Sequence, residues 1–144
     1  MNRHRRPRCA ARLDRVYSGS SATLRRVRYD VTTWLDENGI EPELQGRAAL
    51  VLSELATNAL QASPGSEYNV HGSLSSDGEV VLSVVSRTRY ERPPPREHWG
   101  PPSLMSEGGR GLMIVDDLST DVEVELPSTG MVVVTATLHG ESPA

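Results

Sequence analysis

The segment PELQGRAALVLSELATNALQA, residues 42–62, gives the clearest structural signal in the chain. Its apolar residues recur at intervals of three and four, which places them on one face of an α-helix. Glu41 and Pro42 suit a helix start, because proline is favoured in the first turn, and the sequence Ser-Pro-Gly at 63–65 ends the pattern. The apolar stripe consists of Leu44, Ala48, Val51, Leu52, Leu55 and Ala59. We therefore predict a long helix with one buried face.

A second amphipathic helix is predicted before this one. Ser20 and Ser21 offer N-cap hydroxyls, and Asn38 and Gly39 supply the stop. The residues at helical spacing between these limits are Leu24, Val27, Val31, Trp34 and Leu35.

After residue 65 the hydrophobic period changes from 3.6 to 2, which is typical of strands. An Asp77-Gly78 pair is a hairpin-turn signal between the first two strands, and residues 127–130 form a turn between the last two. The four predicted strands cover residues 68–74, 80–85, 121–126 and 131–138.

The middle of the chain is a long polar loop that leads into a glycine-rich turn. Residues 87–107 include five of the ten prolines, and a loop of this length is either disordered or functional. Gly108 to Gly111 then lead into a short helix. The order of elements predicts an α/β (α+β) two-layer sandwich, with helices packed on one face of a mainly antiparallel sheet.

Length and composition narrow the class of protein. A chain of 144 residues fits one domain, and it contains no apolar run of about 20 residues that could cross a membrane. All fifteen basic residues are arginines, which excludes phosphate-loop lysines and Schiff-base chemistry. The single cysteine, Cys9, cannot form an internal disulfide. With no apolar signal segment after the basic start, we expect a cytoplasmic location.

The charge is unevenly distributed along the chain. Residues 1–28 contain nine arginines and one acid, a net charge of +8, whereas the rest contains six arginines and eighteen acids, a net charge of −12. We expect residues 1–16 to be a basic, disordered arm and residues 17–140 to form the domain. Such an arm can contact nucleic acid or an acidic partner. Six scattered aromatic residues do not make a base-stacking platform, so we do not expect nucleic acid as the partner.

Two polar residues in the long helix could have a chemical role. Glu54 and Asn58 are four residues apart, so they point the same way, and Arg47, Val51 and Gln61 share roughly that face. An amide oxygen is a ligand for magnesium, and a carboxylate can accept a proton. The alternative is an ordinary solvated helix face, because polar pairs at this spacing are common.

The glycine-rich turn also allows two interpretations. Glycines permit close backbone approach, amides at a helix start attract anions, and Arg110 can add charge to a bound phosphate. The alternative is a plain linker or helix entry.

Taken together, these motifs resemble a known superfamily. LVLSELATNALQAS from Leu50 resembles the N-box of the GHKL (Bergerat fold) ATPases, and EGGRGLMIVDDLS from Glu107 resembles their second glycine box. The chain is most similar to the small bacterial anti-sigma factor serine/threonine kinases, over about residues 17–138.

The resemblance implies a function and a set of site residues. The cofactors would be ATP and Mg²⁺, with Glu54 as general base and Asn58 as the magnesium ligand. Residues 89–107 would form the ATP lid. The remaining cofactor-binding residues that the resemblance implies are Ser86, Gly108, Gly109, Arg110, Gly111 and Leu112. The substrate would be a serine or threonine of a STAS-type antagonist protein, and the second partner a sigma factor. Members of this family often pair as homodimers, which leaves a homodimer open.

The sequence departs from the family pattern in the first glycine box. Ser86, Arg87 and Thr88 stand where the family has an adenine-reading aspartate followed two residues later by glycine, and Val132 replaces a common threonine near the end. A hydroxyl is a weaker partner for the adenine amino group than a carboxylate. Retention of Glu54 and Asn58 favours a kinase, whereas loss of the aspartate favours the alternative of a catalytically weak protein-binding module.

Overall fold

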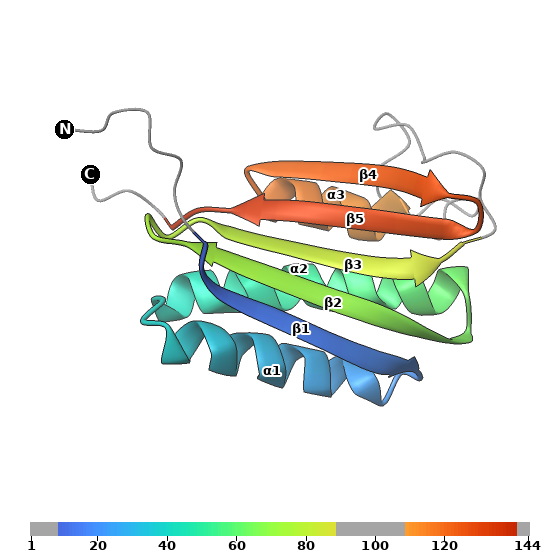
Figure 1. Ribbon diagram of the computed structural model, residues 1–144, viewed down its shortest axis with the longest axis horizontal. Helices are drawn as coiled ribbons and strands as arrows, with labels where there is room; N and C mark the ends of the chain where they lie inside the picture. The colour runs from blue at the N-terminus through green and yellow to red at the C-terminus, as the bar shows by residue number, and fades with distance from the viewer. Residues whose placement is uncertain (1–8, 89–108, 141–144) are drawn as a thin grey trace.

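The computed structural model describes residues 9–88 and 109–140. In this part of the chain, three helices cover one face of a five-stranded antiparallel sheet with strand order β1-β2-β3-β5-β4 (Figure 1). The predicted α+β sandwich is therefore confirmed. The elements are β1 (Cys9–Gly19), α1 (Thr23–Glu37), α2 (Pro42–Ala62), β2 (Gly65–Ser75), β3 (Val80–Arg87), α3 (Gly109–Leu118), β4 (Asp121–Ser128) and β5 (Met131–Leu138).

Strand β1 corrects the prediction of a disordered arm over residues 1–16. Cys9–Gly19 is an ordered edge strand that pairs antiparallel with β2. Leu13 and Tyr17 are buried, whereas the charged residues beside them are exposed. The strand has few core positions and Arg15 interrupts them, so its period-two signal is weak in the sequence. Residues 1–8 lie outside the described residues.

Helices α1 and α2 form where the sequence predicts them. The apolar face of each is buried against its neighbours, and every member of the predicted α2 stripe lies in the core. Burial of a leucine or valine side chain contributes roughly 1.5–3 kcal/mol, so these faces supply much of the stability. Pro42 is at the start of α2 as predicted.

The start of α1 differs from the prediction. The N-cap is Ala22 rather than Ser20 or Ser21. Ser20 lies in the turn before the helix, where its Oγ accepts from the Ala22 amide at 3.2 Å and its carbonyl accepts from the Thr23 amide at 3.0 Å. Both oxygen atoms of Ser20 therefore accept hydrogen bonds in the turn that precedes the helix.

The hairpins follow the predicted turns. Gly78, between β2 and β3, has φ +88°, and Gly130, between β4 and β5, has φ +82°, values that favour glycine. Strand β4 continues to Ser128, beyond the predicted end at 126, with a register shift after Glu125. Pro127 lies within this shift, as expected for a residue without an amide hydrogen.

The predicted lid, residues 89–107, lies outside the described residues. Within the described part of the chain, no helix has the length and apolar character needed to cross a membrane.

Candidate functional site

Arg47, Val51, Glu54 and Asn58 form one stripe along α2. At 3.6 residues per turn, their spacing keeps the four side chains within about 60° of one another around the helix axis. Val51 is fully buried, whereas Glu54 and Asn58 are half-buried. Neither of these two polar side chains has a hydrogen-bond or ion-pair partner within the described residues. The pair therefore shares a face of α2, as the sequence predicts.

The contacts of Arg47 show which way this stripe faces. Its Nη2 donates to the carbonyl of His139 at 2.6 Å, and its Nη1 donates to the carbonyl of Leu118 at 3.4 Å. Leu118 is the last residue of α3, and His139 directly follows β5. The stripe therefore faces α3 and the C-terminal end of β5.

Helix α3 packs against α2 and runs in the opposite direction (Figure 1). Its last residue lies beside Arg47, in the second turn of α2. At 1.5 Å per residue, Gly109 is about 14 Å further along, level with the C-terminal half of α2. This geometry brings the start of α3 to the part of α2 that contains Glu54 and Asn58.

The glycine-rich segment forms the first turn of α3 rather than a turn before it. The helix begins at Gly109, so the amides of Gly109 to Gly111 belong to its first turn, where they have no intrahelical acceptor. Such amides, together with the helix dipole, attract anions. Leu112 is buried. Gly108 and the Arg110 side chain lie outside the described part.

Ser86 and Thr88 approach the same region from the sheet. The chain after β5 returns to the start of α2, where a Cβ on Gly140 would lie 3.0 Å from Glu41 Oε1. Because β3 is antiparallel to β5, the C-terminal end of β3 lies at the other end of the sheet, towards the C-terminus of α2 (Figure 1). Ser86 follows the buried alternation of β3, so it faces the helices.

The burial of these two residues is unusual for polar side chains. Ser86 is 5% exposed and Thr88 is 9% exposed, and they are the two buried polar residues of the described part. Ser86 Oγ has no hydrogen-bond partner there. The amide of Thr88 donates to the carbonyl of Gly130 at 2.9 Å, which fixes the end of β3 against the β4–β5 turn. The sequence pattern predicts no role for Thr88, although its place in the altered glycine box was the available signal.

The candidate site thus combines a carboxylate, a carboxamide, helix-start amides without intrahelical acceptors and the hydroxyl of a buried serine, from three separate elements. In the described residues, no group of three or more His, Cys, Asp or Glu side chains could hold a metal ion alone. Mg²⁺ prefers one or two protein oxygens supplemented by water and substrate phosphates. Glu54 and Asn58, which have no partner within the described residues and lie on the side of α2 that faces α3, offer oxygen atoms of that kind.

Comparisons with known proteins identify the family of the chain and support its fold. The family model described as "Histidine kinase-like ATPase domain" matches residues 18–137. No curated protein matches the chain in a sequence comparison.

Two solved structures have a similar fold. One contains the RsbU and RsbW domains of a Mycobacterium tuberculosis protein, with 21% identity and a TM-score of 0.69; the match covers 94% of this chain but only 34% of the other. The second is the SiaB–SiaC complex from Pseudomonas aeruginosa, with 13% identity, a TM-score of 0.64, and coverage of 86% and 88%. The similarity to these structures concerns the fold. On the family match, which spans most of its length, the chain belongs to the histidine kinase-like ATPase domain family.

Proposed function

We propose that this protein is an anti-sigma regulatory factor that binds Mg²⁺–ATP and phosphorylates a serine or threonine of an antagonist protein. The observation on which this depends most is the pair Glu54 and Asn58. Both are half-buried without partners in the described residues, and they face the helix whose first turn is Gly109 to Gly111. A purely structural helix face of α2 has no need of an unpaired carboxylate and carboxamide in that position.

Each residue has a distinct role in the proposed reaction. Asn58, through its side-chain oxygen, would hold Mg²⁺, whose charge offsets that of the ATP phosphates. The amides of Gly109 to Gly111 bind phosphate oxygens. Leu112 follows them in α3 as an apolar neighbour of the bound nucleotide.

Glu54 acts as the general base of the proposed transfer. It accepts the proton of the substrate hydroxyl while that oxygen bonds to the γ-phosphorus. The bond from this phosphorus to the bridging oxygen breaks, and ADP leaves with the electron pair. Phosphoryl transfer depends mainly on positioning and charge neutralisation, so a chain without lysine can perform it.

The proposed partners are a STAS-type antagonist, as substrate, and a sigma factor. The names of the structural neighbours support a protein partner: one is an RsbW domain in a chain with an RsbU domain, and the other is SiaB in complex with SiaC. A protein of this type acts in the cytoplasm, and pairing as a homodimer is compatible with the proposal.

A second candidate function is a protein-binding regulatory module with little or no catalysis. The observation that favours it is Ser86, a neutral buried residue where the resembled family has a carboxylate for adenine. This candidate predicts partner binding without Mg²⁺-dependent nucleotide binding.

Calorimetric titration with ATP separates the two functions. The kinase proposal expects ATP binding that requires Mg²⁺, and a loss of at least about tenfold in affinity, or 1.4 kcal/mol, on Asn58→Ala. Thr57→Ala is a matched control, because Thr57 is the neighbouring residue and its Oγ1 donates at 2.7 Å to the Ser53 carbonyl of its own helix. Equal ATP affinity in Asn58→Ala would exclude the magnesium role.

The catalytic role of Glu54 needs a separate assay. Glu54→Gln keeps the size of the side chain but cannot accept the proton, so we expect ATP binding to persist while phosphorylation of a STAS-type protein, followed by mass spectrometry, is lost. A folded wild-type protein that binds no nucleotide at millimolar concentration favours the module.

A further inference from the structure

We propose that Arg47 is a positioning residue of this site. It holds the C-terminal end of α3 and thereby sets the place of the first turn of that helix opposite Glu54 and Asn58. The inference rests on the proposed nucleotide site, but it concerns a residue that would touch neither ATP nor the substrate protein.

The guanidinium of Arg47 joins three elements. From α2 it reaches the carbonyl of Leu118, at the end of α3, and the carbonyl of His139, after β5, at 3.4 and 2.6 Å. The carbonyls in the last turn of a helix have no intrahelical donor, and a positive charge near them also interacts favourably with the helix dipole. Arg47 therefore supplies a hydrogen-bond donor and a positive charge at the C-terminal end of α3.

Glu43 holds the guanidinium in this orientation. Its Oε1 lies 2.7 Å from Arg47 Nε and its Oε2 lies 3.2 Å from Nη2, so the two side chains form a two-point pair within α2. The Arg47 side chain is 22% exposed. Lysine has a single point of charge and cannot reproduce this fork. The geometry thus requires arginine rather than any cation.

The length of α3 links this contact to the candidate site. The helix has ten residues, a length of about 15 Å, and Val115 in its middle is fully buried in the core. A short helix that is packed at its centre and fixed at one end has its other end fixed as well. Loss of the Arg47 contacts would let α3 tilt about Val115, which moves the amides of Gly109 to Gly111.

Displacement of that first turn affects nucleotide binding more than it affects folding. The core residues of α3 remain buried after a small tilt, whereas a misplacement of about 1 Å at a functional site can cost about a hundredfold in rate. A merely structural role for Arg47 predicts the reverse, a loss of stability with unchanged affinity in the folded fraction.

The test compares Arg47→Met, Arg47→Lys and Glu43→Gln with the wild-type protein. The control is Gln45→Ala, because Gln45 also lies in the first half of α2 but makes its side-chain hydrogen bonds on the α1 side. Its side chain donates to Asp36 Oδ1 at 3.1 Å and to the Ile40 carbonyl at 2.8 Å. For each variant, thermal unfolding, Mg²⁺–ATP affinity and amide hydrogen exchange of α3 are measured.

We expect Arg47→Met to lose at least about tenfold in Mg²⁺–ATP affinity and to exchange the hydrogen-bonded amides of α3, from residue 113 onward, faster. Arg47→Lys and Glu43→Gln should lie between it and the wild type, and Gln45→Ala should alter stability alone. If Arg47→Met does not fold, the affinity and the exchange of Arg47→Lys and Glu43→Gln test the proposal.

Wild-type affinity and wild-type exchange of α3 in folded Arg47→Met or Arg47→Lys would overturn the proposal, as would equal effects in Gln45→Ala. If the wild-type protein binds no nucleotide, the proposed function fails, and the exchange of α3 still decides whether Arg47 fixes this helix.

Discussion

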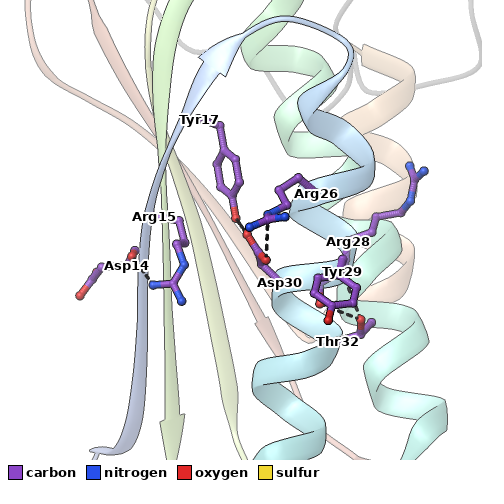
Figure 2. A network of polar contacts seen from close by, with 8 residues as sticks. All are labelled: Asp14, Arg15, Tyr17, Arg26, Arg28, Tyr29, Asp30 and Thr32. Atoms are coloured by element: carbon purple, nitrogen blue, oxygen red, sulfur yellow. Dashed lines mark hydrogen bonds and ion pairs between the residues drawn. The ribbon is translucent and has the colours of Figure 1, made fainter.

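The phenol of Tyr17 donates a 2.7 Å hydrogen bond to Oδ2 of Asp30, which joins the edge strand β1 to helix α1 (Figure 2). Arg26 Nε lies 3.5 Å from the other oxygen of the same carboxylate. The ring of Tyr17 also stacks on Tyr68 of β2, with centroids 5.6 Å apart. These contacts attach β1 to α1 in the helix layer and to β2 in the sheet.

Removal of the Tyr17 hydroxyl should weaken this attachment. We expect Tyr17→Phe to lower the free energy of unfolding by about 2 kcal/mol, because the lost hydrogen bond has a charged acceptor. Urea unfolding measures this difference. Tyr29→Phe is the control: Tyr29 is 62% exposed and its hydroxyl has no partner in the described residues, so the same change should have no effect. Equal losses in both variants would contradict the role of the Asp30 bond.

The same cluster predicts a loss of stability in alkali. Burial, and next the hydrogen bond to Asp30, raise the pKa of Tyr17, and burial raises the pKa of Tyr68. Above pH of about 10 the unfolded chain releases phenol protons that the folded chain retains, so stability falls as pH rises. For each retained proton, the slope approaches about 1.4 kcal/mol per pH unit.

Unfolding measured from pH 8 to pH 11 checks this expectation. Tyr17→Phe removes one of the two phenols, so its stability should fall less steeply and approach that of the wild type as pH rises. Parallel curves for the two proteins would show that Tyr17 titrates normally in the folded state.

Two glycines should respond oppositely to alanine. A Cβ on Gly72 in β2 would lie 3.0 Å from two ring carbons of Trp34, a rigid side chain that is 7% exposed, and 3.3 Å from Leu13 Cβ. Gly72→Ala should therefore destabilise the protein by about 1–3 kcal/mol through overpacking. In contrast, a Cβ on Gly46 in α2 meets no atom within 4 Å, so Gly46→Ala should stabilise by about 0.5–1 kcal/mol. Thermal unfolding of both variants measures the sign of each change in stability.

If the proposed nucleotide site is correct, Ser86→Asp should increase the preference for ATP over GTP. A serine hydroxyl can both donate and accept, so it suits the amino group of adenine and the carbonyl of guanine alike. A carboxylate accepts only, and it repels a carbonyl oxygen. We expect the ratio of GTP to ATP dissociation constants to rise by about tenfold or more in calorimetric titration. Ser83→Asp is the control. Ser83 is also a serine of β3, but its side chain lies on the opposite face of the sheet, so this change should leave the ratio unchanged.

Elements with a strong local period could be predicted from the sequence. Helix α2 buries an unbroken stripe, and β2 and β3 alternate regularly, so their patterns are complete within each segment. Strand β1 was missed because its burial depends on pairing with β2, more than fifty residues later in the chain. The shared face of Glu54 and Asn58 could be predicted because residues four apart lie on the same side of any α-helix.

Local sequence patterns are enough to predict the helices, the hairpins, the fold class and the shared face of Glu54 and Asn58, because each depends on neighbours within a few residues. Three relations became visible only in the tertiary structure: Arg47 donates to the carbonyl of Leu118 at the end of α3, α3 runs antiparallel to α2 (Figure 1), and Ser86 is buried on the helix-facing side of the sheet. These relations join segments of the chain about 30 to 90 residues apart. They depend on packing between elements, which no local periodicity encodes.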